Sequence, residues 1–248
     1  MTDSNLHVPL RRAGPVAPIF DPFRYVEAEP PRAPMILGAG HRARNHDLYR
    51  RVGKRACDIA FVLVTAPLAL TIVGVCALLL WVEGGNPFYR QDRLGRAGRI
   101  FSILKLRTMV RDADAQLEAC LAADPALRQE WDTTQKLKND PRITPVGSFL
   151  RKTSLDELPQ LWNVLTGEMS IVGPRPMLPE QLALYGDARH YFALKPGITG
   201  FWQVSQRNNG RFQLRVALDA DYDTRLSPWQ DFRVLLLTVG AVLRRTGH

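Results

Sequence analysis

Cysteine and histidine are scarce in this sequence. The three cysteines, Cys57, Cys76 and Cys120, are widely spaced and odd in number, which excludes a disulfide framework and fits a reducing compartment. The five histidines are scattered and the cysteines form no close pair, so we expect no structural zinc site. The first residues, MTDSNLHVPLRRAG, lack the apolar stretch of a secretory signal, and we expect no cleaved leader.

Acidic residues are in the minority. The chain has 24 Asp and Glu against 33 Lys and Arg, which gives a net charge of +9. This excess of positive charge fits either a nucleic-acid binder or a protein held against anionic lipid. No recognition motif for nucleic acid is found, so we expect no nucleic-acid partner. A hydrophobic fraction of 46% excludes a wholly disordered chain.

The N-terminal region has no hydrophobic periodicity. Residues 1–40 contain seven prolines, and no helical or strand pattern is found there. We therefore predict a disordered, proline-rich tail over residues 1–45 and a single domain over residues 46–248.

Charge is missing altogether from residues 59–82, IAFVLVTAPLALTIVGVCALLLWV. A straight helix of these 24 residues would be about 36 Å long, which is enough to cross a hydrocarbon core of roughly 30 Å. Pro67 lies inside the run, cannot donate a backbone hydrogen bond and should kink the helix. The hydroxyl of Thr65 could bond a carbonyl one turn back and reduce that cost.

Both flanks of this run are basic. Residues 41–55 carry six Arg or Lys and one Asp, and residues 88–111 carry seven and one. The positive-inside tendency would place both ends on the cytoplasmic face, which favours a re-entrant helix over about residues 48–82 and a cytosolic part over 83–248. The pattern alone leaves a simple transmembrane span equally open.

The cytosolic part has a mixed pattern. Residues 87–108 indicate a β-hairpin, residues 111–135 two helices broken at Asp124-Pro125, and residues 195–200 a turn. Residues 211–225 and 229–245 are helical in pattern, and the second could pack in the core or lie on the membrane surface. The predicted fold class is α+β, mainly α: membrane-monotopic, with a Pro-kinked re-entrant helix, a small β-hairpin and amphipathic interfacial helices.

The densest pattern is LRKTSLDELPQLWNVLTGEMSIVGPRP, residues 150–176. Ser154 and Glu157 match a capping box, and acidic residues in a first helical turn are favoured by the helix dipole. Asp156 and Glu157 could therefore serve only to begin a helix. Their surroundings suggest more, because basic residues occur on both sides, at Lys105, Arg107, Arg151, Arg175 and Arg207.

Two adjacent carboxylates with several cations suit a site for phosphate groups and Mg²⁺. Arginine binds phosphate oxygens in bidentate fashion, and Mg²⁺ commonly takes one or two carboxylates together with substrate phosphates. A carboxylate can also attack phosphorus itself and form an acyl phosphate. The linear sequence does not show whether these side chains converge.

Three segments carry a family resemblance. They are KLRTM (105–109), DPRITPVGSFLRKTSLDELPQLWNVLTGEMSIVGPRP (140–176) and LKPGITGFWQVSQRN (194–208). Together they resemble the bacterial sugar transferase family, the monotopic polyprenol-phosphate phosphoglycosyl transferases, over roughly residues 48–245. The length matches the short, catalytic-domain form of that family.

The resemblance implies a reaction and a location. A sugar-1-phosphate, with galactose or glucose as the sugar, would pass from a UDP-sugar to undecaprenyl phosphate with release of UMP, as the first membrane step of exopolysaccharide or surface glycan synthesis. The protein would sit in the bacterial inner membrane at the cytoplasmic face, with the kink at Pro67, so its partners would be the two substrates and the lipid bilayer. Whether it forms a homodimer stays open.

The resemblance also implies roles for residues. Asp156 would be the nucleophile that forms a covalent phosphosugar intermediate, and Glu157 would help to hold Mg²⁺. The substrate phosphates would be bound by four basic residues, Lys105, Arg151, Arg175 and Arg207.

One position departs from the family pattern, because Gln206 precedes Arg207 where glycine is common. This departure puts the role of Arg207 in doubt and weakly favours an alternative, a catalytically inactive membrane-anchored adaptor of a polysaccharide assembly system. The two short Asp-Ala-Asp motifs, 112–114 and 219–221, resemble metal motifs of other glycosyltransferases, but we expect them on solvated helix faces.

Overall fold

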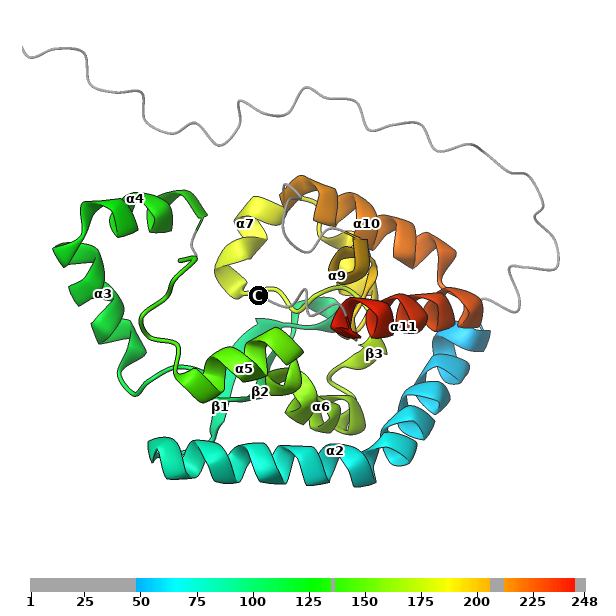
Figure 1. Ribbon diagram of the computed structural model, residues 1–248. Helices are drawn as coiled ribbons and strands as arrows, with labels where there is room; N and C mark the ends of the chain where they lie inside the picture. The colour runs from blue at the N-terminus through cyan, green and yellow to red at the C-terminus, as the bar shows by residue number, and fades with distance from the viewer. Residues whose placement is uncertain (1–47, 135–136, 206–211, 244–248) are drawn as a thin grey trace, which may run out of the picture. The chain divides into compact units, whose positions relative to one another are not determined.

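The computed structural model describes residues 48–134, 137–205 and 212–243 (Figure 1). The predicted tail, Gln206 and Arg207 lie outside the described residues. The described part is mostly helical with a small antiparallel sheet, as expected. Its elements are η1 Tyr49–Gly53, α2 Lys54–Gly84, β1 Phe88–Leu94, η2 Arg96–Gly98, β2 Ile100–Leu106, α3 Ala113–Ala123, α4 Pro125–Thr134, α5 Pro145–Thr153, η3 Leu155–Gln160, α6 Leu161–Thr166, β3 Ser170–Val172, η4 Pro179–Gln181, α7 Leu182–Tyr185, α8 Arg189–Ala193, β4 Gly197–Thr199, α9 Phe201–Ser205, α10 Phe212–Arg225 and α11 Pro228–Leu243.

The charge-free run forms one long helix, α2, with Pro67 inside it. Figure 1 shows α2 as two straight arms joined at a bend. The hydroxyl of Thr65 donates to the carbonyl of Phe61 at 2.8 Å, one turn back, as the sequence suggested. Thr71 does the same to the carbonyl of Pro67 at 2.9 Å. By length and composition alone, α2 could cross a membrane.

Helix α2 packs against the rest of the described part along its whole length. Its buried apolar side chains form one narrow stripe: Val62 belongs to the main core, whereas Cys76 and Leu80 pack with Leu106 and Leu150. Most of its other apolar side chains are exposed, including Val64, Leu68, Leu70, Trp81 and Val82. The two ends of α2 therefore contact the same folded unit, and a broad apolar surface is left without protein cover.

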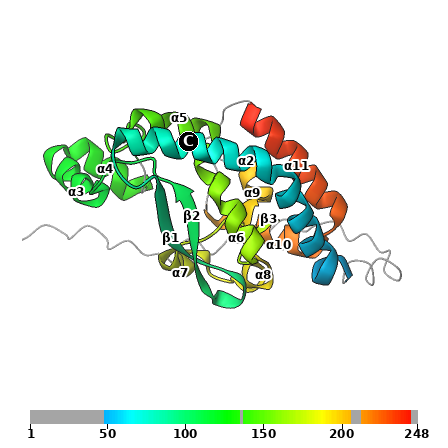
Figure 2. The same cartoon turned by 90° about the horizontal axis from the view of Figure 1, so that it is seen from below.

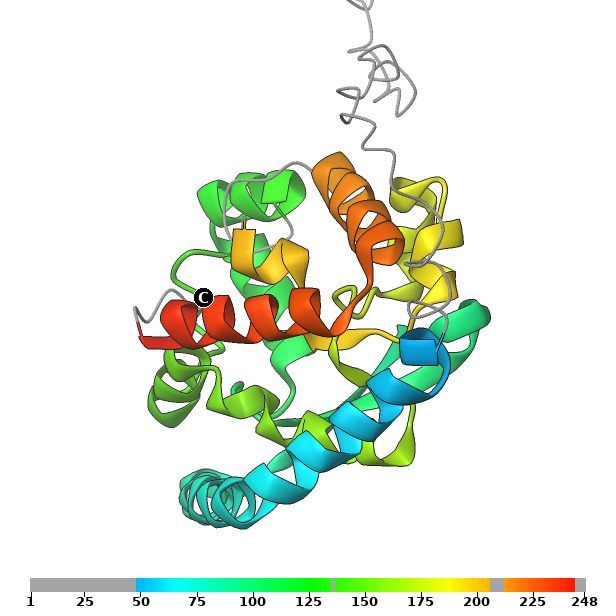
Figure 3. The ribbon, with the colours of Figure 1, turned by 90° about the vertical axis from the view of Figure 1, so that its right-hand side faces the viewer.

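Part of the basic flank before α2 is used inside the protein. Lys54 donates to Asp231 at 2.7 Å and to the hydroxyl of Tyr222 at 2.9 Å. Arg50 pairs with Asp223 at 2.7 Å. These contacts tie η1 and the first turn of α2 to α10 and α11, which lie beside them in Figures 1 and 3. The positive charge of Lys54 is therefore neutralised by protein and not available to lipid.

The predicted hairpin is confirmed as β1 and β2, which pair with Tyr89 opposite Lys105 and Arg93 opposite Phe101. Seen from below, the hairpin runs from the end of α2 to α8 (Figure 2). The buried Asn163 of α6 lies against the edge of β2: its Oδ1 accepts from the Leu104 amide and its Nδ2 donates to the Ser102 carbonyl, both at 2.9 Å. This amide replaces a third strand and fixes η3 and α6 against the sheet.

The segment 195–200 differs from the predicted turn. Gly197–Thr199 forms a short strand, β4, which pairs in parallel with β3. The pairing depends on close backbone approach, because a Cβ on Gly197 would lie 2.7 Å from the Cα of Gly173. The Gly173-Pro174-Arg175 loop is thereby fixed to a second segment far along the chain.

The helices expected at 111–135 and near the C-terminal end are found. Helices α3 and α4 meet at Asp124, whose carboxylate accepts from the Ala126 amide at 2.8 Å. Helix α11 buries Asp231 and Val234 and exposes Trp229, Phe232 and Leu236. It therefore both packs in the core and presents an apolar outer face.

Candidate active site

The Asp-Glu dyad follows a sharp reversal of the chain. Helix α5 ends at Thr153, Ser154 adopts the left-handed conformation with φ 58°, and η3 begins at Leu155. Asp156 and Glu157 thus occupy the first turn of a short 3-10 helix. The predicted capping box is wrong, because the Ser154 side chain makes no cap hydrogen bond and only its carbonyl accepts from the Glu157 amide, at 3.3 Å.

Glu157 pairs with a lysine from the hairpin. Its Oε1 lies 2.8 Å from the Nζ of Lys105, and the two side chains are only 24% and 19% exposed. Since β2 and η3 are neighbours, Lys105 is brought to a dyad 51 residues further along the chain. The structure therefore joins two of the sequence-predicted site residues directly.

Asp156 lies in a partly buried position beside that pair. The pKa of its carboxyl is raised to about 6, mainly by burial and also by the charge of Glu157, against the opposing charges of Lys105 and Arg151. Within the described residues, no side chain donates a hydrogen bond to this carboxylate. Asp156 thus combines a raised pKa with a carboxylate that accepts no side-chain hydrogen bond from the described residues.

Arg151 is held at the same site from the last turn of α5. Its Nε donates to the hydroxyl of Thr108 at 2.8 Å. Burial lowers the pKa of this guanidinium, whereas the charge of Asp156 opposes that change. The structure brings together Lys105, Arg151, Asp156 and Glu157, four of the six predicted site residues.

Arg175 belongs to a second group of cations. Its side chain is exposed, and its carbonyl accepts a short hydrogen bond from the buried guanidinium of Arg215 in α10. Its charge also acts on Arg93 of β1. The strongest electrostatic influences on Asp156 do not include Arg175. Arg207 lies outside the described residues, so the structure does not place it.

The second group contains a residue that the sequence analysis missed. The pKa of Arg93 is lowered to about 10, mainly by burial and also by the charge of Arg175. Within the described residues the buried Nη1 of Arg93 has no hydrogen-bond partner. The available signal was its register, because Arg93 lies opposite the buried Phe101 on the hairpin. Two neighbouring guanidiniums of this kind suit an anion such as phosphate.

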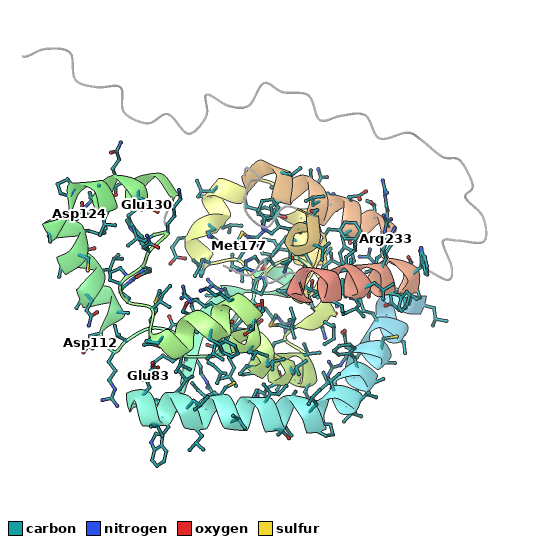
Figure 4. The ribbon with its side chains drawn as sticks, in the orientation of Figure 1. Glu83, Asp112, Asp124, Glu130, Met177 and Arg233 are labelled. Carbon is teal, nitrogen blue, oxygen red and sulfur yellow. The ribbon has the colours of Figure 1, made fainter. Side chains whose placement is uncertain are left out.

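The loop that carries Arg175 is held to the end of β1. The amide of Leu94 donates to the carbonyl of Met177 at 2.8 Å. The hydroxyl of Tyr191 accepts from the Met177 amide and donates to the carbonyl of Leu94 at 2.6 Å. Met177, labelled in Figure 4, is fully buried. This anchoring keeps Arg175 near Arg93.

The expectation that Asp219 lies on a solvated helix face is wrong. Its side chain is 2% exposed, and its Oδ2 accepts from the Tyr185 hydroxyl at 2.7 Å and lies 3.7 Å from the Nε of Arg215. Burial raises the pKa of Asp219 to about 6. The helical pattern of the sequence did not predict this burial, because it depends on the contact of Asp219 in α10 with Tyr185 in α7. Asp112, by contrast, is exposed as expected.

The sequence that builds this site matches a known family. The bacterial sugar transferase family model matches residues 49–245. The match covers nearly all of the described residues, and the chain belongs to this family.

Individual relatives agree with that assignment. The chain is 47% identical over 214 residues to a UDP-galactose-lipid carrier transferase of Erwinia amylovora, a match covering 86% of this chain and 44% of that protein. It is 43% identical to an undecaprenyl-phosphate galactose phosphotransferase of Salmonella typhimurium, covering 82% and 42%. It is 42% identical to the exopolysaccharide production protein ExoY of Sinorhizobium fredii, covering 79% and 88%. The chain thus spans less than half of the first two proteins and most of the third.

Proposed function

We propose that this protein transfers a sugar-1-phosphate from a UDP-sugar, with galactose or glucose as the sugar, to undecaprenyl phosphate and releases UMP. The names of its relatives support both substrates and both sugars: the Salmonella typhimurium relative is named for galactose, and a relative in Escherichia coli is named a UDP-glucose:undecaprenyl-phosphate glucose-1-phosphate transferase. The single observation that carries the proposal is the Asp156 carboxylate, which is basic, free of side-chain donors among the described residues and flanked by cations. The product would start an exopolysaccharide or surface glycan.

The first step is a displacement at phosphorus. An Asp156 carboxylate oxygen attacks the sugar-bearing phosphorus of the UDP-sugar, and the bond from that phosphorus to the bridging oxygen breaks. The electron pair leaves with UMP, and an acyl-phosphate link to the sugar phosphate forms on Asp156. A phosphate oxygen of undecaprenyl phosphate then attacks the same phosphorus, which regenerates the carboxylate and yields the lipid diphosphate sugar.

The surrounding residues lower the charge repulsion in this exchange. Lys105 pairs with Glu157, the neighbour of Asp156, and the positive charge of Arg151 also acts on Asp156. Preorganised cations in a partly buried place stabilise developing phosphate charge more strongly than they would in water. We assign phosphate binding also to Arg175, whose side chain is exposed, and to Arg207, which lies outside the described residues.

The dyad fits Mg²⁺ as a cofactor. Glu157 would hold the ion together with substrate phosphates and water, because the described residues contain no cluster of three or more acidic, histidine or cysteine ligands. Bound there, Mg²⁺ would neutralise part of the charge on the diphosphate.

We also propose that α2 is re-entrant and that the protein sits in the cytoplasmic face of the bacterial inner membrane. A spanning helix would leave the folded unit at one end, whereas α2 contacts that unit at both ends. Its first turns pair with Asp231, and Leu80, near its end, packs with Leu106. Its uncovered apolar side, together with the outer face of α11, would rest in one leaflet, where a soluble and a lipid substrate can meet.

The test is release of UMP by the full chain in nanodiscs with undecaprenyl phosphate, Mg²⁺ and a panel of UDP-sugars. We expect release with UDP-galactose or UDP-glucose, and a sugar-phosphate adduct on Asp156 in intact-mass spectra taken without the lipid acceptor. Asp156→Asn should abolish both signals, and Asp112→Asn, an exposed carboxylate, is the matched control. Release that persists in Asp156→Asn would exclude this nucleophile. The absence of release with every donor would favour the inactive-adaptor alternative.

A further inference from the structure

A cavity lies at the C-terminal end of α2, next to the end of its exposed apolar surface. It is lined by side chains and backbone from the end of α2, the segment after β2 and the residue before α5, namely Glu83, Gly84, Arg107, Val110, Arg111 and Thr144. Figure 4 shows Glu83 at the end of α2, on the side toward α5. The residues that line it do not include Asp156, Glu157 or Lys105. The cavity is therefore not the site formed by the dyad.

Two arginines dominate the cavity. A Cβ added to Gly85, which has φ +103°, would meet both guanidiniums and would lie 2.7 Å from the Nη1 of Arg107. Because Gly85 has no side chain, the guanidinium groups of Arg107 and Arg111 can both lie against its backbone. Glu83 supplies a single opposing carboxylate, so the lining keeps an excess of positive charge.

The two arginines differ in how they are held. Arg107 donates from Nη2 to the carbonyl of Gly84 at 2.5 Å and so caps the end of α2. Its Nε is buried and has no hydrogen-bond partner among the described residues. Arg111 is exposed and has no ion pair within the described part of the chain. Both retain donor capacity for an anion.

The position of the cavity indicates where that anion comes from. Trp81 and Val82, the residues just before Glu83, are 67% and 77% exposed and end the uncovered apolar surface of α2. Tryptophan at such a border commonly marks the level of lipid headgroups. The phosphate groups of membrane lipids lie at this level.

The cavity also lies next to the reaction site. The Arg107 amide donates to the carbonyl of Pro87 at 2.8 Å and continues the pairing of the hairpin. Arg107 directly follows β2 and is two residues from Lys105, so the Cα atoms of the two residues are about 7 Å apart. A phosphate bound by Arg107 would therefore lie close to Lys105, the lysine that pairs with Glu157.

We propose that Arg107 and Arg111 form a binding site for the phosphate group of a membrane lipid. The site rests on the proposed membrane seating of α2. The same chemistry is carried by two lipids, the polyprenol phosphate acceptor and an anionic phospholipid, and the experiment separates them.

The experiment measures lipid binding by native mass spectrometry of the full chain in detergent, without any UDP-sugar. The probes are undecaprenyl phosphate, undecaprenol, which lacks the phosphate, and phosphatidylglycerol. We expect undecaprenyl phosphate to bind at least about tenfold more tightly than undecaprenol, because charge-assisted hydrogen bonds to phosphate are strong. Arg111→Gln should remove most of that difference, and Arg111→Lys should restore part of it.

The controls separate the site from general effects. Arg99→Gln removes an exposed charge on the hairpin loop and should leave binding as in the unaltered protein. Arg107→Gln also removes the cap of α2, so Arg111 carries the test. Competition by phosphatidylglycerol would identify a headgroup site, and binding of undecaprenyl phosphate alone would identify an acceptor site.

Equal binding of both lipid phosphates by Arg111→Gln and the unaltered protein would overturn the proposal. This readout needs no turnover, so its failure is distinct from failure of the proposed reaction. If the protein releases UMP but Arg111→Gln does not change lipid binding, the proposed reaction stands and the proposed lipid-phosphate site is excluded.

Discussion

Two aspartates in this protein share a raised pKa and differ in almost everything else. Burial lifts the pKa of both Asp156 and Asp219 to about 6. Asp219 is enclosed and has the Tyr185 hydroxyl and Arg215 as partners. Asp156 is partly exposed, and no side chain in the described part of the chain donates to it. A buried carboxylate whose hydrogen bonds are filled holds a structure together, whereas one that is left open can bind or attack a substrate.

The largest effects on activity and stability should come from removing the charge of each aspartate in turn. Asp156→Asn should lower UMP release by roughly 1,000-fold or more, because it removes the nucleophile, and should leave the thermal midpoint nearly unchanged. Asp219→Asn should lower the thermal midpoint and still form the covalent adduct at low temperature. The comparison would break if Asp219→Asn abolished the adduct in protein shown to be folded.

The cations beside the two aspartates should behave just as differently. Arg215→Met leaves Asp219 as a buried, unpaired charge, and we expect a loss of about 3–5 kcal/mol in unfolding free energy. Lys105→Met, at a partly exposed pair, should change stability by about 1 kcal/mol or less while lowering activity strongly. Denaturant unfolding of both variants in detergent measures the difference. Equal destabilisation by the two variants would contradict the comparison, because it would mean that both ion pairs contribute equally to stability.

The pH dependence of stability offers a finer test of Asp219. Its folded pKa of about 6 exceeds the ordinary value of 3.8, so the folded state retains the proton to higher pH. Its contribution is fully present below about pH 4 and is lost as pH rises to about 6, by roughly 1 kcal/mol per pH unit. The stability of the unaltered protein relative to Asp219→Asn should therefore fall over that window and level off above it. Thermal melts of both proteins across the range measure it, and a rise would contradict the assignment.

The smallest expected effect extends the comparison to arginines. Arg142 is fully engaged, because its guanidinium bonds both oxygens of Asp140. Arg93 keeps a buried Nη1 without a partner in the described residues. Arg93→Gln should raise the KM for the UDP-sugar by about tenfold with little change in kcat, because a phosphate contact is lost. An unchanged KM would mean that Arg93 serves only the packing of the hairpin.

Much of the local structure was predictable. Alternation and turn residues indicated the hairpin, and Asp124-Pro125 indicated the break between α3 and α4. Three predictions failed: the turn at 195–200, the cap at Ser154 and the solvated position of Asp219. Gly197–Thr199 became a strand because β3 lies beside it, and Ser154 failed to cap because the chain reverses there. The partners of Glu157 and Asp219 also come from other elements, which no local window contains.

The sequence by itself determined the long apolar helix and the motif that carries the dyad, since apolar character and residue chemistry belong to the residues themselves. Only the tertiary structure decided which aspartate is left open and which cations approach it. It also decided that Lys54 pairs with Asp231 and that Arg93 joins Arg175. The physical reason is that burial and charge pairing depend on distances in space between segments far apart in the chain.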